Sequence, residues 1–168
     1  RVLNMVTEKT QVLGDFLCTV DFHVAGGIIH VGAAPFNDRR IGYITGGKFE
    51  GPRLSGEVLP GGGNWSVGGR LGEDATVGTL DARAVLRTHD GALIYVNYFG
   101  RSVIPDDVRR EFADPALASK VDPSRYYLRI ASLFETASPD YAWLNGTVAI
   151  GVGERTDLGA RHRLYSVR

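Results

Sequence analysis

Apolar and polar residues alternate with a period of two along much of the chain, which is the pattern of half-buried β-strands. The clearest example is residues 15–24, where one face is predicted to hold Phe16, Cys18, Val20, Phe22 and Val24. A similar alternation reaches Val58 and stops at Pro60 and three glycines. Further strands are predicted over residues 124–131, 141–152 and 160–167. The alternation therefore predicts an antiparallel all-β protein.

A β-hairpin is predicted over residues 76–100, because two alternating runs flank Asp90-Gly91, a pair typical of two-residue turns. Such a turn would place Arg83 opposite Tyr98 and Leu86 opposite Tyr95. One face would then carry Leu80, Ala82, Ala84, Leu86, Leu93, Tyr95, Asn97 and Phe99. The other would carry Asp81, Arg83, Val85, Arg87, Ile94, Val96 and Tyr98.

One helix is predicted over residues 105–112, where a proline precedes two aspartates and two apolar residues lie one turn apart. The length of 168 residues suits a single domain over residues 1–168. About eight to nine strands in such a domain favour a single antiparallel β-barrel, since closure removes exposed sheet edges. The short helix would be peripheral, and a two-sheet sandwich is the alternative architecture.

Composition narrows the function classes. The single cysteine, Cys18, excludes an internal disulfide framework and a cysteine-rich zinc site, and it alternates with apolar residues as a core residue does. Equal numbers of basic and acidic residues, 19 each, argue against nucleic acid or a membrane as partner. The histidines His23, His30, His89 and His162 lack metal-ligand spacing and are interpreted as surface or half-buried residues. No metal or cofactor is expected. We expect a cytoplasmic protein; secretion stays open because a leader could precede Arg1.

Two glycine-containing motifs are rejected. Residues 42–48 match the start of a phosphate-binding loop, but Phe49 replaces the required Ser or Thr, and Gly51-Pro52 forbids the following helix. Residues 151–153 begin like a dinucleotide fingerprint, but Thr156 replaces its third glycine. Neither motif supports nucleotide binding.

Several predicted strands carry a face that mixes aromatic and hydrogen-bonding side chains: Asp81, Arg83 and Tyr98; Tyr127 and Arg129; Tyr141, Trp143, Asn145 and Thr147. Such a face suits the wall of a ligand cavity, or it is simply the solvent-exposed side of the sheet. The glycines of residues 61–63 precede Asn64 and Trp65, so Trp65 either walls a ligand site or covers a barrel end.

Three blocks of the chain carry a family resemblance: residues 46–65, residues 80–95 without 84–87, and residues 126–145. They include Gly-Gly-Lys-Phe-Glu-Gly-Pro-Arg-Leu at 46–54, Leu-Asp-Ala-Arg at 80–83 and Phe-Glu-Thr at 134–136. In order and spacing they resemble the domain-of-unknown-function 3237 family of small microbial proteins. The resemblance implies a lipocalin-like or allene-oxide-cyclase-like barrel and no settled activity. Asn64 stands where the family usually has Asp, so an acid or base role there would be lost.

The overlap of these blocks with the mixed faces favours a pocket. The first hypothesis is a cofactor-independent isomerase, cyclase, hydratase or lyase acting on a small hydrophobic or aromatic molecule. Asp81 or Glu135 would transfer the proton, and Arg83 or Arg129 would hold an oxyanion. The substrate would be bound by Trp65, Asn64, Tyr98, Tyr127, Tyr141, Trp143 and Asn145.

The second hypothesis is a non-catalytic, lipocalin-like carrier of the same kind of ligand, which the substitution at Asn64 favours. In either case an outer apolar face of the barrel could join two copies, so a homo-oligomer, and first a dimer, is expected.

Overall fold

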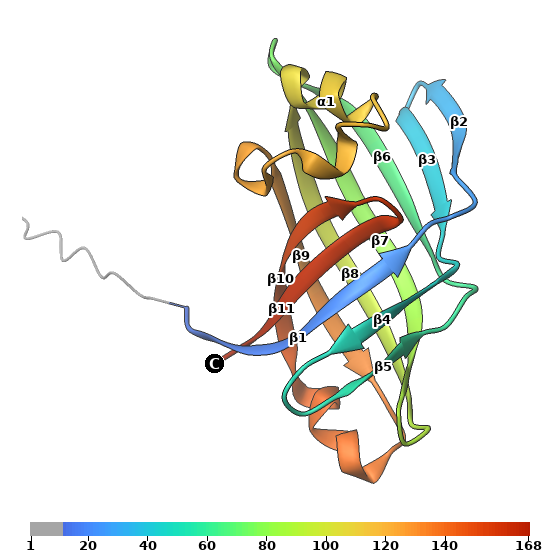
Figure 1. Ribbon diagram of the computed structural model, residues 1–168, viewed down its shortest axis with the longest axis vertical. Coiled ribbons are helices and arrows are strands. Elements are labelled where there is room, and N and C mark those ends of the chain that lie inside the picture. Colours follow the sequence, from blue (N-terminus) through green and yellow to red (C-terminus); the bar gives the residue numbers. More distant parts are fainter. Residues whose placement is uncertain (1–11) are drawn as a thin grey trace, which may run out of the picture.

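The structure is a computed structural model that describes residues 12–168 (Figure 1). Its first strands are β1 (Gly14–His23), β2 (Ile28–Ala34), β3 (Asn37–Tyr43), β4 (Gly46–Glu50), β5 (Ser55–Val58) and β6 (Gly63–Leu71). The later strands are β7 (Ala75–Thr88), β8 (Leu93–Pro105), β9 (Tyr127–Glu135), β10 (Val148–Thr156) and β11 (Gly159–Val167). The helical segments are α1 (Asp106–Phe112) and the 3-10 segments η1 (Ala118–Lys120), η2 (Pro123–Arg125) and η3 (Pro139–Gly146).

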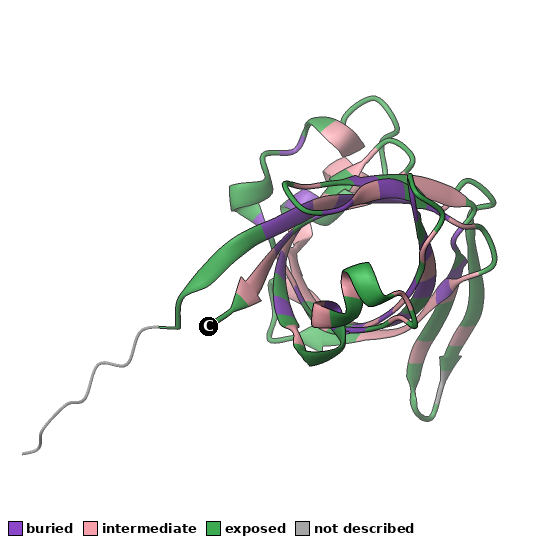
Figure 2. Ribbon diagram, turned by 90° about the horizontal axis from the view of Figure 1, so that it is seen from below, coloured by how far each residue is buried: buried purple, intermediate pink, exposed green. Residues whose placement is uncertain are grey.

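Eight of the strands form a closed ring. The pairing runs β7-β5-β4-β1-β11-β10-β9-β8, and the long hairpin β7–β8 completes the circle (Figure 2). Strands β6, β3 and β2 extend the sheet from the part of β7 beyond β5. The predicted antiparallel barrel is confirmed; the described chain has eleven strands, because three lie outside the ring.

The barrel interior is filled with apolar side chains at the end where η3 lies. Phe49, Leu86, Ile94 and Val96 are almost fully buried there, and Leu144 of η3 is buried in the same cluster. The η3 segment itself lies at the lower end of the barrel in Figure 1 (orange). Burying each such side chain contributes about 1.5–3 kcal/mol relative to leaving it exposed. This lower interior is therefore the hydrophobic core of the barrel.

Toward the α1 end the inner face of the barrel becomes partly exposed. The change from buried to partly exposed occurs between Ala82 and Leu80 on β7, between Tyr98 and Gly100 on β8, and between Ile130 and Leu128 on β9. We call the inner wall beyond this level the upper lumen. Its walls include Thr76, Gly78, Leu80, Gly100, Ser102, Ile104 and Leu128.

The predicted hairpin is present, but its predicted register is wrong by one residue. Thr88 N–H donates to the Ala92 carbonyl at 2.9 Å, and Gly91 has a φ of +91°, so the loop is one residue longer than a two-residue turn. Tyr98 therefore pairs with Ala82, and Asn97 with Arg83. Because a one-residue shift moves every side chain of a strand to the other face, Tyr98 points into the barrel and not outward with Arg83.

Strand β1 departs from simple alternation near its start. The register with β11 shifts between Phe16 and Cys18, so Leu17 and Cys18 are both buried while Phe16 is 45% exposed. The core position predicted for Cys18 is confirmed, and burial raises the pKa of its thiol to about 12. The prediction that Phe16 shares the inner face was wrong because of this bulge.

Residues 139–146 form η3 and not the first half of a predicted strand. Pro139 occupies the first turn of this segment, where its fixed φ is compatible with a helix. As a result Tyr141, Trp143 and Asn145 do not share a strand face. The helix predicted over residues 105–112 is confirmed as α1.

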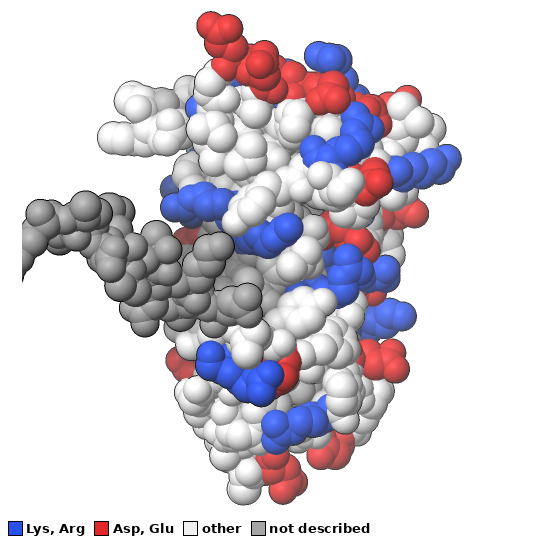
Figure 3. All heavy atoms as spheres, turned by 90° about the vertical axis from the view of Figure 1, so that its left-hand side faces the viewer, with Lys and Arg blue, Asp and Glu red and all other residues white. Residues whose placement is uncertain are grey.

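Acidic side chains gather at the α1 end of the molecule (Figure 3). Several of them are paired: Arg125 contacts Asp107 at 3.0 Å, and Arg70 contacts Asp106 at 2.8 Å. Within residues 12–168, no helix has the length and apolar character needed to cross a bilayer.

Candidate functional site

The predicted site residues lie in four separate places. Trp65, Asp81 and Arg83 share the outer face of β6 and β7, where Arg83 Nη1 is 3.5 Å from Asp81 Oδ1. The Arg83 guanidinium lies 5.9 Å from the Trp65 ring centroid. Both members of the ion pair are well exposed, so the pair contributes at most about 1 kcal/mol. None of these three side chains faces the barrel interior.

Tyr127, Arg129 and Glu135 lie on the outer face of β9. The Arg129 guanidinium is 4.8 Å from the Tyr127 ring centroid. Glu135 lines a hollow of about 250 Å³ between β8, β9 and the end of η3, together with Asn97 and Asn145. Glu135 is thus separated from the other predicted carboxylate, Asp81, which lies on β7.

The side chains of η3 hold the lower end of the barrel together. The Tyr141 hydroxyl donates to the Asp90 carboxylate, at 3.1 and 3.2 Å from its two oxygens. Hydrogen bonds from Thr88 and then Tyr141 lower the pKa of Asp90. The Arg53 guanidinium stacks over Trp143 at 3.7 Å from the ring centroid. These contacts give Tyr141 and Trp143 structural roles at the closed end.

Asn145 clamps the chain after β9. Its Oδ1 accepts from Thr136 N–H at 2.8 Å, and its Nδ2 donates to the Thr136 carbonyl at 2.9 Å. We expect Asn145→Ala to lower the free energy of unfolding by about 1–3 kcal/mol, because two hydrogen bonds are lost. Urea denaturation measures this, with Gly146→Ala as the control, because a Cβ added there would meet nothing within 4 Å. Equal stability of Asn145→Ala and the wild type would contradict the clamp.

Asn64 and Tyr98 lie on the inner wall. Asn64 pairs with Ala82 in the register of β6 and β7, and its Oδ1 accepts from Asp81 N–H at 3.0 Å. This bond supports the β6–β7 seam next to a stretch without regular pairing. Tyr98 is 4% exposed and lies where the closed interior meets the upper lumen.

Tyr98 belongs to a group of inner residues that we call the floor cluster: Phe22, Tyr98, Ser132 and His162. The Phe22 and Tyr98 ring centroids are 5.2 Å apart, and those of Tyr98 and His162 are 5.8 Å apart. Ser132 pairs with Tyr98 across the β8–β9 ladder, which brings their Cβ atoms to within about 5.5 Å. The cluster joins β1, β8, β9 and β11.

Two polar atoms of the floor cluster have no hydrogen-bond partner within residues 12–168: Ser132 Oγ and His162 Nδ1. Both residues are essentially fully buried, and leaving such a group unpaired costs about 1–3 kcal/mol. Burial lowers the pKa of His162 to about 4 and raises the pKa of Tyr98. Near pH 7 the cluster therefore holds a neutral imidazole and a protonated phenol.

His162 and Ser132 are not among the candidate site residues predicted from the sequence. His162 is 1% exposed, so its interpretation as a surface or half-buried residue was wrong. A signal existed, because His162 alternates with the apolar Leu164. Its space comes from Gly153, where an added Cβ would lie 2.7 Å from His162 Nδ1. Gly153 lies beside His162 because of the β10–β11 register, which could not be predicted from the sequence.

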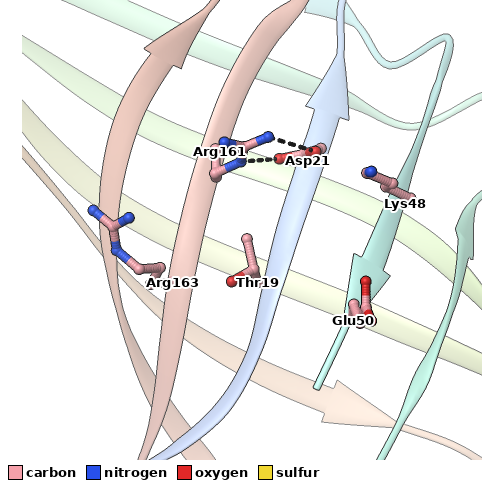
Figure 4. Close-up of a pocket in the computed structure, with 6 residues that line it drawn as sticks. All are labelled: Thr19, Asp21, Lys48, Glu50, Arg161 and Arg163. Atoms are coloured by element: carbon pink, nitrogen blue, oxygen red, sulfur yellow. Dashed lines mark hydrogen bonds and ion pairs between the residues drawn. The ribbon is translucent and has the colours of Figure 1, made fainter.

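A second hollow, of about 290 Å³, lies on the outer face of β1, β4 and β11 (Figure 4). It is lined by Thr19, Asp21, Lys48, Glu50, Arg161 and Arg163. Asp21 accepts two hydrogen bonds from Arg161, at 2.6 and 3.1 Å, and these bonds lower the pKa of Asp21. A carboxylate held in this way is a poor base, so the hollow is a charge network that joins neighbouring strands. Within the described residues, no group of three potential metal ligands occurs.

Known proteins share both the sequence and the fold of this chain. A UPF0311 protein of Clostridium acetobutylicum is 30% identical over 130 residues, covering 77% of each chain. A UPF0311 protein of Rhodopseudomonas palustris is 31% identical, covering 77% of this chain and 80% of its own length.

Solved structures agree with the barrel. A β-barrel-like protein from Acinetobacter baumannii is 29% identical, with a TM-score of 0.78 over 96% of this chain and 99% of that chain. An enzyme from Penicillium herquei shares the fold alone, at 19% identity and a TM-score of 0.60, over 96% and 98% of the two chains. The model of the protein-of-unknown-function family DUF3237 matches residues 14–167, and the chain therefore belongs to this family.

Proposed function

We propose that the upper lumen binds a small hydrophobic or aromatic molecule that carries an oxygen function, and that the floor cluster transfers a proton on it. The reaction would be that of a cofactor-independent isomerase, cyclase, hydratase or lyase. One observation carries the proposal: Ser132 Oγ and His162 Nδ1 are buried without partners beside Tyr98, and the inner face of the barrel becomes partly exposed just beyond Tyr98. Unpaired buried polar groups are costly, and a ligand oxygen would satisfy them.

The roles of the floor cluster follow from its protonation states. The protonated phenol of Tyr98 can donate a hydrogen bond to a carbonyl and to the oxyanion that develops from it. The neutral imidazole of His162 can accept a proton, although burial makes it a weak base. A negative charge developing on the ligand would stabilise the imidazolium, so proton transfer and oxyanion formation would support each other. Phe22 would pack against an aromatic ring.

The walls of the upper lumen support an apolar ligand with few polar groups. Leu80, Ile104 and Leu128 supply apolar area, whereas Thr76 and Ser102 add hydroxyl groups. This mixture is typical of small-molecule sites. The carboxylates Asp81 and Glu135 lie on outer faces, so in this proposal the proton-transfer role passes from them to His162 and Tyr98.

A non-catalytic carrier is the second candidate. Asn64 favours it, since an amide has no proton to exchange near neutral pH, and its Oδ1 is already used by the β7 backbone. In a carrier the floor cluster would only hydrogen-bond the ligand. The two functions predict the same binding and differ in turnover.

The test begins with a thermal-shift screen of small aromatic and terpenoid-like compounds, followed by mass spectrometry of any stabilising compound over time. We expect Leu80→Trp, which fills the upper lumen, to lose the thermal shift, and Val85→Trp, on the outer face of the same strand, to keep it. Tyr98→Phe should retain binding within about tenfold and lower turnover by about 10²–10³-fold.

Two results would count against the proposal. A compound whose shift persists in Leu80→Trp and disappears in Val85→Trp would place the site outside the lumen. A ligand recovered unchanged from the wild type, with affinity reduced in Tyr98→Phe, would favour the carrier over the enzyme for that ligand.

A further inference from the structure

A band of exposed apolar side chains crosses five adjacent strands on the outside of the barrel. The register places one row in line across β8, β9, β10, β11 and β1: Phe99, Ala131, Ile150, Tyr165 and Phe16. Next to it, Leu133 of β9 pairs with Val148 of β10. Phe99, Ile150, Phe16, Leu133 and Val148 are each between 41% and 51% exposed. A contiguous apolar face of this kind on a folded protein marks an interaction surface.

The two edges of this apolar band differ in charge and in hydrogen-bonding groups. On the side toward the upper lumen, Arg101 and Arg129 stand directly opposite each other, and within residues 12–168 neither contacts an acidic side chain. Like charges in such a pair repel. On the other side, Glu135 lines the 250 Å³ hollow, together with Asn97, whose Oδ1 is buried without a hydrogen bond in the described chain. One edge thus offers donors, and the other offers acceptors.

We propose that the apolar band is the interface of a two-fold symmetric homodimer. A two-fold axis that runs across the strands, between the Ala131 and Leu133 rows, brings each edge against the opposite edge of the second copy. Arg129 lies two residues from Ala131, and Glu135 lies two residues from Leu133 on the other side. Arg129 of one copy therefore faces Glu135 of the other, and the hollow beside Asn97 receives a guanidinium.

A second copy fits this surface better than a partner of single-sign charge, because the band is bordered by both signs. β8 and β1 lie four steps apart in the ring of eight strands, half-way round the barrel from each other, so the contact between two copies centres on β9, β10 and β11. Figure 3 views the side of the barrel that is on the left of Figure 1, where uncharged residues lie between basic and acidic side chains. The charge pattern therefore agrees with a dimer.

Sedimentation equilibrium of the full chain over a range of concentrations tests the proposal. We expect a monomer–dimer equilibrium that Ile150→Glu weakens at least 100-fold. Arg129→Glu and Glu135→Arg should each weaken it by about tenfold or more, and the double variant should recover most of the affinity. Phe36→Glu, at an 84% exposed position in the β2–β3 turn, is the control and should leave the equilibrium unchanged. Circular dichroism of each variant confirms that it is folded.

Three results would overturn the proposal. The first is a wild type that stays monomeric up to about millimolar concentration, well above the dissociation constants of specific dimers. The second is a double charge reversal that weakens association as much as both single changes together, since Arg129 and Glu135 would then not meet. The third is a monomer that sediments with neutral lipid vesicles unless Ile150 is replaced, which would assign the band to a membrane surface. None of these results depends on a ligand in the upper lumen.

Discussion

Replacing Gly56 with alanine should lower the free energy of unfolding by about 3 kcal/mol or more, near the upper end of what overpacking costs. Gly56 of β5 pairs with Thr88 of β7 on one side and with Phe49 of β4 on the other. A Cβ at Gly56 would lie 2.0 Å from the Arg87 carbonyl oxygen and 2.8 Å from the Thr88 Cα. These are backbone atoms, so relief requires β5 and β7 to separate, and this seam closes the ring.

Chemical denaturation of Gly56→Ala against the wild type measures the effect. Gly26→Ala is the matched control, since a Cβ there would meet nothing within 4 Å. We expect the control to stay within about 0.5 kcal/mol of the wild type or to be slightly more stable, because alanine restricts the unfolded chain. A Gly56→Ala protein as stable as Gly26→Ala would show that the β5–β7 seam is looser than described.

Protonation of His162 should make the protein markedly less stable in mild acid. Burial lowers the pKa of His162 from 6.5 to about 4 in the folded state. The unfolded chain therefore binds the extra proton first, and stability falls as the pH drops from about 6.5 to about 4, by up to ~3 kcal/mol. Above the unfolded pKa this contribution is fully present.

Denaturation curves at several pH values between 7 and 4 test this dependence. His162→Leu should flatten the slope in that window, whatever its effect on stability at pH 7, whereas Gly26→Ala, which changes no titratable group, should keep the wild-type slope. Asp21 also makes the stability depend on pH, because hydrogen bonds from Arg161 lower the pKa of its carboxyl group. Its contribution is present above the ordinary carboxyl pKa and is lost at lower pH. An unchanged slope in His162→Leu would mean that His162 is not buried neutral.

Local alternation was sufficient to predict the fold class and much of the core. Val20, Phe22 and Leu86 were assigned to apolar faces from spacing alone, and all are buried in the barrel. The short helix α1 was predicted from Pro105 and the two aspartates that follow it, and it is present. These features depend on residues close together in the chain, where period and capping act directly.

The side of the sheet predicted for Tyr98 was wrong because of one local feature, the length of the hairpin loop. One additional residue in the loop after Thr88 moved Tyr98, Val96 and Ile94 from the predicted mixed face to the inner face. The proposed use of Asp81 and Arg83 beside Tyr98 depended on that register. The strand placement predicted for Asn145 was wrong for a different reason, because Pro139 starts a 3-10 segment where alternation predicted a strand.

The sequence by itself determined an antiparallel barrel with Cys18 in its core and no cysteine cross-link, because alternation and residue counts are local or additive properties. Only the tertiary structure decided which polar groups share the lumen. His162 and Ser132 meet Tyr98 because β11, β9 and β8 close around one axis, and Gly153 leaves the space for the imidazole. Pairing between strands that are distant in the sequence decides which side chains lie together. A register shift of one residue decides whether a side chain points into the barrel or outward.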